Sequence, residues 1–129
     1  MKIEHLAIWV KNLEGMKHFY ETYFHGKANN KYRNDKKQFE SYFLSFAAGP
    51  RLELMNRPDI PDNINDLVKE YIGIIHFAVS VGSKETVDSL TERLRKDGYA
   101  VVGEPRWTGD GYYESVILDP EGNRVEVTI

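Results

Sequence analysis

The stretches EHLAIWV at residues 4–10 and GPRLEL at residues 49–54 both recur later in the chain. IHFAVSV at residues 75–81 repeats the first at an offset of 71, and GNRVEV at residues 122–127 repeats the second at an offset of 73. Independent segments would not keep a nearly constant offset across a whole module. The sequence therefore indicates a duplication.

The first copy predicts a strand, a helix and three further strands. In its first strand, Leu6 and Ile8 lie on one face while His5 and Trp9 lie on the other. Apolar residues then recur at helical spacing, and Gly26 supplies a stop signal. The predicted elements are a strand at 2–10, a helix at 13–24 and strands near 28–34, 39–47 and 51–56.

The second copy predicts the same order of elements. Ser83 is the expected N-cap of its helix, which Gly98 ends, and the run Asp119-Pro120-Glu121-Gly122 fits a type I turn. The predicted elements are a strand at 74–81, a helix at 83–98 and strands near 99–103, 112–118 and 123–129.

The repeat predicts an α+β fold in which two tandem βαβββ modules form a curved mixed sheet around a metal-binding cavity. We expect one domain over residues 1–129, with module one at 1–57 and module two at 74–129. The connector at 58–73 begins with prolines and contains a possible short helix at 64–71.

Bulk composition excludes several classes of function. The 129 residues are 41% hydrophobic and 29% charged, which is the balance of a globular protein. The net charge of −3 is spread along the chain, so we expect no nucleic-acid or anionic-membrane partner. The absence of cysteine excludes disulfides, thiolate metal sites and a cysteine nucleophile.

Compartment and assembly are inferred from the apolar runs and from the expected strand edges. A glutamate and a histidine interrupt the first apolar run, which does not resemble a signal peptide, and no stretch is long enough to span a membrane. We therefore expect a cytoplasmic protein. Small duplicated sheet proteins commonly cover their strand edges by dimerisation, so we expect a homodimer.

The duplication matches His5 with His76 and Glu53 with Glu126. In each copy the histidine and the glutamate lie on the strand faces that alternate with the apolar core positions. If the two sheets curl around a shared cavity, the four side chains converge.

Two imidazoles and two carboxylates suit one divalent metal ion, such as Ni²⁺, Zn²⁺, Co²⁺, Mn²⁺ or Fe²⁺. The two carboxylates would neutralise the metal, which lowers the free energy required to bury it. A single strand histidine or glutamate is usually structural or solvated. The repetition of both residue types in register favours the metal site. His18 and His25 have no counterparts in the second copy and are expected on the surface.

Aromatic and charged residues leave alternatives open. Trp9 shares a face with His5, and Trp107, Tyr112 and Tyr113 flank the Thr-Gly-Asp-Gly loop, where either core packing or a pocket wall is plausible. The charged run at 31–37 fits a solvated hairpin end, or a clasp for an anionic substrate tail.

These motifs resemble the vicinal oxygen chelate superfamily, which includes glyoxalase I, bleomycin-resistance proteins and dioxygenases. The resemblance lies in the βαβββ duplication, the early H-x-A-I-x-V, the later H-F-A-V-S-V and the terminal D-P-E-G-N-R-V-E-V, and it spans essentially the whole chain. Within the superfamily, the set His5, Glu53, His76 and Glu126 is similar to that of glyoxalase I, or lactoylglutathione lyase.

The resemblance implies a metal-dependent carbon–sulfur lyase that detoxifies methylglyoxal. The implied small-molecule substrate is a hemithioacetal, whose vicinal oxygens bind the metal while a carboxylate moves a proton through an enediolate. It further implies that Glu126 and Glu53 are the catalytic base and proton shuttle, and Glu126 is favoured as the base.

Two positions depart from the glutathione-dependent relatives. Those proteins place arginine where this chain has Trp9 and asparagine where it has Arg57. Another thiol or another vicinal-dioxygen substrate is therefore an alternative. Alternative functions are an epimerase or dioxygenase of the same superfamily, or a non-catalytic resistance protein that binds a small molecule.

Overall fold

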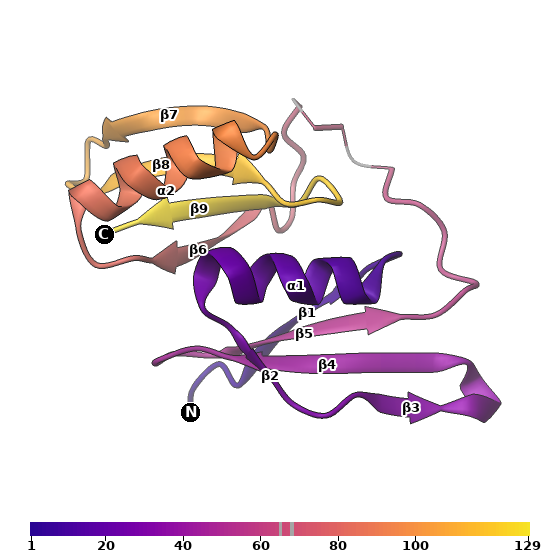
Figure 1. Ribbon diagram of the computed structural model, residues 1–129. Coiled ribbons are helices and arrows are strands. Elements are labelled where there is room, and N and C mark those ends of the chain that lie inside the picture. The colour runs from indigo at the N-terminus through magenta and orange to yellow at the C-terminus, as the bar shows by residue number, and fades with distance from the viewer. Residues whose placement is uncertain (65, 68) are drawn as a thin grey trace. The chain divides into compact units, whose positions relative to one another are not determined.

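The chain divides into two units, Met1–Asn63 and Ile64–Ile129, and each is described by itself. The computed structural model describes residues 1–64, 66–67 and 69–129 (Figure 1). The boundary between the units falls inside the expected connector. Among the described residues, no helix is both long and apolar enough to cross a membrane.

Unit 1 contains a mixed sheet with strand order β1-β5-β4-β2, and β3 also pairs with β4. β1 and β5 run parallel, whereas β4 is antiparallel to β2, β3 and β5. The elements are β1 (His5–Trp9), α1 (Leu13–Phe24), β2 (Lys27–Ala28), β3 (Tyr32–Asn34), the 3-10 helix η1 (Asp35–Lys37), β4 (Phe39–Ser45) and β5 (Arg51–Asn56).

Unit 2 repeats this arrangement with strand order β6-β9-β8-β7. β6 and β9 run parallel, and β8 is antiparallel to both β7 and β9. The elements are β6 (His76–Ser80), α2 (Lys84–Lys96), β7 (Val101–Trp107), β8 (Tyr113–Leu118) and β9 (Arg124–Thr128). The predicted α+β class and the two βαβββ modules are confirmed, and each module has its own mixed sheet.

Two details differ from the sequence prediction, and one lies outside the described residues. The strand expected near 28–34 is split into β2 and β3, and the strand expected near 99–103 extends to Trp107 as β7. β7 accommodates Pro105 because it is an edge strand of its sheet, where a missing N–H is tolerated. The possible helix at 64–71 includes Asn65 and Val68, which lie outside the described residues.

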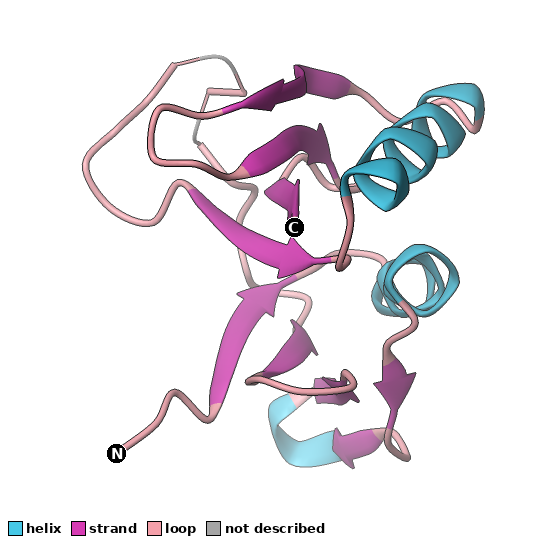
Figure 2. Cartoon of the chain, turned by 90° about the vertical axis from the view of Figure 1, so that its left-hand side faces the viewer, coloured by secondary structure: helices cyan, strands magenta, loops and turns pink. Residues whose placement is uncertain are grey.

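In each unit the α-helix lies against one face of the sheet (Figure 2). In unit 1 the fully buried side chains include Met16, Phe19 and Tyr20 from α1, which pack with Leu44 and Leu54. Burial of such side chains is the main stabilising contribution to the fold, roughly 1.5–3 kcal/mol for each. The opposite sheet face therefore remains available for polar side chains.

Unit 2 buries Val87 and Leu94 of α2 against its sheet. Thr91 is buried on the same side of α2. Its hydroxyl donates to the carbonyl of Val87 at 2.6 Å and contacts the Ser115 hydroxyl at 2.6 Å. Both buried hydroxyls are thereby satisfied, which avoids the free-energy penalty of an unpaired buried polar group.

Local signals explain the helix ends. Ser83 is the N-cap of α2 and accepts a hydrogen bond from the Thr86 amide at 3.2 Å, as predicted. Gly98 follows α2 with a φ of +92°, a conformation that glycine adopts readily. At the end of α1, His25 adopts the left-handed conformation with a φ of +55°, and Gly26, the predicted stop signal, follows it directly.

The predicted turn after β8 is present. The Gly122 amide donates to the Asp119 carbonyl at 3.0 Å, which closes the turn, and Gly122 has a φ of +82°. The Asp119 carboxylate also accepts from the amides of Glu121 and Asn123. This turn fixes the register between β8 and β9, and hence the position of Glu126.

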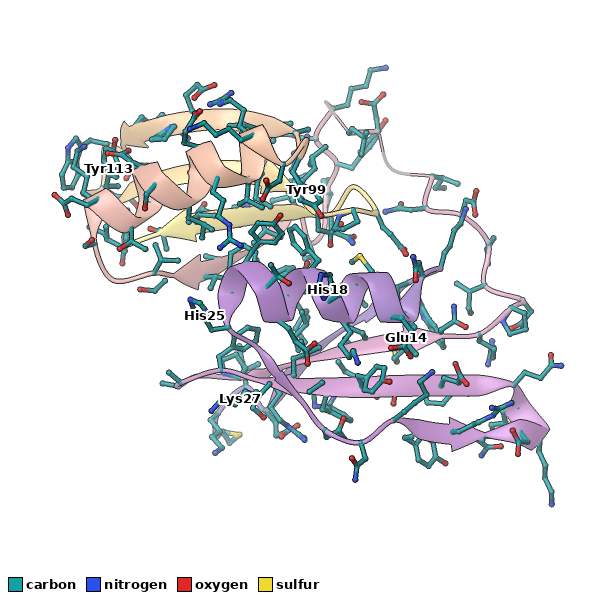
Figure 3. The ribbon with its side chains drawn as sticks, viewed as in Figure 1. Glu14, His18, His25, Lys27, Tyr99 and Tyr113 are labelled. Carbon is teal, nitrogen blue, oxygen red and sulfur yellow. The ribbon has the colours of Figure 1, made fainter. Side chains whose placement is uncertain are left out.

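In each unit a tyrosine hydroxyl of the sheet donates a hydrogen bond to an acidic side chain of the helix. Glu14 and Tyr113, one residue from each of these bonds, are labelled in Figure 3. In unit 1 the Tyr42 hydroxyl donates to Glu14 at 3.0 Å, and Lys31 binds the same carboxylate at 2.6 Å. In unit 2 the Tyr113 hydroxyl donates to Asp88 at 2.7 Å. These bonds hold the helix-facing side of each sheet in place.

Replacing Tyr42 with phenylalanine tests the unit 1 cluster. The hydrogen bond from Lys31 is the largest cause that lowers the pKa of Glu14 below its ordinary value of 4.5, and Tyr42 adds to it. The stability that this carboxylate contributes is present above its unfolded pKa and is lost as pH falls through the folded one. We expect Tyr42→Phe to lower the free energy of unfolding by about 1 kcal/mol at pH 7.

Urea unfolding of both proteins at pH 7 and pH 3 measures this difference, which should narrow at pH 3. Tyr32→Phe is the matched control, because Tyr32 is 53% exposed on β3. An equal loss in both variants would contradict the expected role of Tyr42.

Candidate functional site

The helix-free face of each sheet carries a histidine and a glutamate on adjacent parallel strands. In unit 1 the β1–β5 register pairs His5 with Arg51 and Ala7 with Glu53. Because side chains alternate along a strand, Glu53 points away from the buried Leu52 and Leu54. Parallel pairing therefore brings the imidazole and the carboxylate together on one surface.

His5 is held from two sides. Its Nε2 lies 3.8 Å from Oε2 of Glu53, and its ring meets Phe43 edge-on with centroids 5.3 Å apart. Its Nδ1 contacts Oε2 of Glu4 at 2.5 Å, and Arg51 Nε donates to the other oxygen of Glu4 at 2.8 Å. The Glu4 carboxylate thus bridges His5 and Arg51.

This arrangement determines the orientation of the His5 ring. A carboxylate only accepts hydrogen bonds, so Nδ1 carries the shared proton and Nε2 is directed toward Glu53. The bond with His5 is the largest cause that lowers the pKa of Glu4, and Arg51 lowers it further. A carboxylate on the second ring nitrogen is the usual partner of a metal-binding histidine.

Unit 2 repeats the pair with closer geometry. His76 Nε2 lies 3.3 Å from Glu126 Oε2, and the two side chains are 42% and 16% exposed. Ile75 stands where unit 1 has Glu4, so this histidine has no carboxylate from the preceding residue. The two copies therefore share the donor pair but not its supporting contacts.

Glu126 lies beside a second carboxylate. Burial raises the pKa of Glu126, and the negative charge of Glu114 raises it further, while the charges of His76 and Arg106 act in the opposite direction. Glu114 is only 9% exposed, and its Oε1 lies 3.2 Å from Nη2 of Arg106. A raised pKa means that Glu126 keeps its proton to a higher pH than an ordinary glutamate does.

These side chains line an open cavity of about 700 Å³ that belongs to unit 2. This volume lies within the range of small-molecule sites. The residues that line it include His76, Glu126, Glu114, Arg106, Leu67 and Glu70. Unit 2 thus joins a candidate donor pair to a space that can accept a small molecule.

The structure brings together His5 with Glu53 and His76 with Glu126. Each pair belongs to one unit, and the four predicted ligands are divided between the two units. Among the described residues, no group of three or more histidine, aspartate or glutamate side chains is close enough to hold a metal. Each unit by itself therefore supplies two donors.

The other predicted residues have structural contacts. Trp9 is 41% exposed, with the Arg57 guanidinium 5.5 Å from its ring. Tyr113 is buried, and Trp107 meets its ring at 5.2 Å. Lys31, in the charged run at 31–37, binds Glu14 in an ion pair. The prediction that His18 and His25 are surface residues is confirmed.

Sequence reasoning missed Glu4, Glu114 and Arg106. Glu4 had no signal in the sequence beyond its place next to His5, because its other partner, Arg51, is distant in the chain. A signal for Glu114 was the period of two along β8, which assigns it to the face of Glu126. Arg106 had no local signal, because β-bulges between Val101 and Arg106 shift the register of β7.

Comparison with known proteins gives one partial match among curated sequences. A stretch of 59 residues is 37% identical to the uncharacterised protein YqjT of Bacillus subtilis. The match covers 43% of this chain and 46% of that protein, so it spans less than half of the relative.

Solved structures match over nearly the full chain. The glyoxalase family protein from Enterococcus faecalis is 22% identical with a TM-score of 0.78, covering 99% of this chain and 97% of the other. The trypanothione-dependent glyoxalase I of Leishmania major is 21% identical with a TM-score of 0.77, covering 98% and 85%. At these identities the likeness establishes the fold.

A family model decides the relationship. The model of the glyoxalase/bleomycin resistance protein/dioxygenase superfamily matches residues 2–127. It includes both strand repeats and both histidine–glutamate pairs. The chain belongs to the glyoxalase/bleomycin resistance protein/dioxygenase superfamily.

Proposed function

We propose that His5, Glu53, His76 and Glu126 hold one divalent metal ion, and that the protein is a glyoxalase I-like lyase acting on a small molecule with vicinal oxygens. The observation that carries the proposal is the repeated histidine–glutamate pair, at 3.8 Å in unit 1 and 3.3 Å in unit 2. In both units the pair lies on the helix-free face of a parallel strand pair.

The donors fit a divalent ion of the first transition series. Imidazole nitrogen and carboxylate oxygen suit Ni²⁺, Zn²⁺, Co²⁺, Mn²⁺ and Fe²⁺, and two carboxylates balance the charge. The Glu4 contact that directs His5 Nε2 toward Glu53 supports this assignment. Since each unit supplies two donors, a set of four requires two units, either of one chain or of two copies in a homodimer.

The chain's own residues supply the proton transfer. A bound metal ion would polarise the substrate's carbonyl oxygen and acidify the neighbouring C–H bond. Glu126 is the proposed base, since burial and Glu114 raise its pKa toward the range where a base works best. It would take the proton from one carbon and return it to the next, with Glu53 as the alternative shuttle.

The proposed substrate class is a hemithioacetal formed from methylglyoxal and a thiol. Arg57, at the position where glutathione-dependent relatives have asparagine, forms an ion pair with Asp59 at 2.5 Å and lies against Trp9. Trp9 and Arg57 replace the arginine and the asparagine of those relatives, which favours a thiol other than glutathione. Metal analysis of protein purified without chelators, followed by thioester formation from methylglyoxal with several thiols, tests the proposal.

Substitution of one ligand in unit 2 should remove activity while the fold remains. We expect His76→Ala to lose bound metal and Glu126→Gln to reduce turnover at least a hundredfold, because a general base contributes about that much. Circular dichroism, bound-metal content and thioester formation report the outcome. His18→Ala is the control, because His18 is exposed on α1.

Full activity in both substituted proteins would overturn this mechanism. Tight ligand binding without turnover, and survival of that binding after chelation, would instead indicate a non-catalytic binding protein.

Removal of the Glu4 carboxylate tests the orientation of His5. Glu4→Gln keeps the size of the side chain but weakens the bond to Nδ1, so we expect metal affinity to fall roughly tenfold to a hundredfold. Competition with a fluorescent chelator measures this affinity. Glu92→Gln on α2 is the matched control, and equal affinities in both variants would exclude an orienting role for Glu4.

Glu126 should also reduce the stability of the metal-free protein. Its raised pKa means that ionisation is less favourable in the folded chain than in the unfolded one, so stability falls as pH rises through these pKa values. We expect metal-free Glu126→Gln to be more stable than wild type at pH 7, by no more than about 1 kcal/mol.

This advantage should disappear at pH 4, where the carboxyl group is largely protonated. Urea unfolding in the presence of a chelator measures it at both pH values. A less stable variant at pH 7 would show that the carboxylate has a structural role.

A further inference from the structure

The cavity of unit 2 contains an arginine that the proposed proton transfer does not use. Arg106 lies on β7, opposite Glu114 of β8, and Glu126 lies on the next strand, β9. Two interstrand spacings, roughly 10 Å, separate the strand of Arg106 from that of Glu126. The positive charge of Arg106 is close enough to lower the pKa of Glu126.

Glu114 holds Arg106 from one side. Nη2 of Arg106 lies 3.2 Å from Oε1 of Glu114, which is a buried residue. The Arg106 side chain is 54% exposed, so the guanidinium reaches from a buried anchor into the cavity. A guanidinium has five N–H donors in a planar fork, and a second anion can bind at an edge that Glu114 does not occupy.

Arg106 differs from the other arginine among the described residues that line the cavity. Arg124 is only 14% exposed, and its Nη2 donates to the carbonyls of Leu67 and Lys69 at 2.8 and 3.4 Å. The hydrogen bonds of Arg124 are therefore directed to the backbone carbonyls of Leu67 and Lys69. Arg106 is the arginine whose charge faces the open volume.

The equivalent surface of unit 1 is different. By the offset of 73, Ser41 occupies the position of Glu114, and aromatic side chains occupy its surroundings: Trp9 and Phe39 meet at 6.0 Å, as do Tyr32 and Phe39. The same offset matches Arg106 with Arg33, but the Arg33 side chain is 69% exposed and its partners Asp35 and Glu40 are 82% and 27% exposed. The arginine of unit 1 therefore lacks the buried carboxylate that anchors Arg106.

We infer that Arg106 binds an anionic group of the substrate, a carboxylate or a phosphate, and so determines substrate specificity. The inference rests on the proposed function, in which the metal ion held by the histidine–glutamate pairs would bind the vicinal oxygens of the substrate. The substrate class becomes a vicinal-dioxygen compound with an anionic tail. Glu114 is a positioning residue that keeps the guanidinium at the cavity wall.

Two chelating probes of similar size test the inference without turnover. Glutaric monohydroxamate has a vicinal-oxygen head and a carboxylate tail, and pentanohydroxamate has the same head with a methyl group in place of the carboxylate. Calorimetric titration of Zn²⁺-loaded protein gives both affinities. We expect wild type to prefer the anionic probe about tenfold, and Arg106→Gln to bind both equally.

Two further variants separate charge from position. Arg106→Lys should keep part of the preference, because lysine retains the charge without the fork. Arg33→Gln is the matched control, because Arg33 forms an ion pair with Glu40 on the β3–β4 pair of unit 1. It should leave the tenfold preference unchanged.

Metal-free protein provides an independent readout. In an NMR titration with glutarate, the Nε–H signal of Arg106 should shift and saturate, while that of Arg33 should not. An anionic preference that survives in Arg106→Gln, or an Arg106 signal that glutarate leaves unmoved, would overturn the inference. If neither hydroxamate binds the Zn²⁺-loaded protein but glutarate shifts Arg106, the proposed metal function fails and the anion site stands.

Discussion

Parallel pairing between the first and the last strand of each module is the constraint on which the site depends. In unit 1 it sets Ala7 opposite Glu53, and in unit 2 it sets Ala78 opposite Glu126, so each glutamate lies diagonally across from its histidine. A shift of one residue would send each carboxylate into the apolar layer under the helix. The buried residues on either side of the glutamates prevent such a shift.

Contacts on the helix-facing side of each sheet support this register. The Tyr113 hydroxyl binds Asp88 of α2, and Thr91 binds Ser115, so β8 is attached to its helix through side chains adjacent to Glu114. Because neighbouring residues of a strand point to opposite faces, fixing Tyr113 and Ser115 also fixes Glu114 between them. The position of the candidate site is therefore set partly by bonds on the other side of the sheet.

Periodicity along the chain predicted the helices and strands whose position depends on local sequence patterns. It did not predict strand boundaries that depend on pairing with neighbouring strands. The duplication, the helix at 13–24 and the strand at 51–56 are all local in origin, and the structure confirms them. The split of the strand near 28–34 and the extension of β7 past Pro105 depend on which neighbours pair. The bridge from Glu4 to His5 and Arg51 joins strands that are distant in the chain, so no spacing rule could reveal it.

Divergence between the copies gives a physical reason to distinguish two otherwise equivalent glutamates. Both are next to a histidine, but Glu126 has the buried carboxylate Glu114 on its diagonal, where Glu53 has the uncharged Ser41. Negative charge beside a partly buried carboxylate favours its protonated form, which a base requires after it has taken a proton. Unit 1 instead orients its histidine through Glu4. The duplication thus supplies equivalent histidine–glutamate pairs, and later substitutions gave the histidine of one copy a carboxylate partner and the glutamate of the other a carboxylate neighbour.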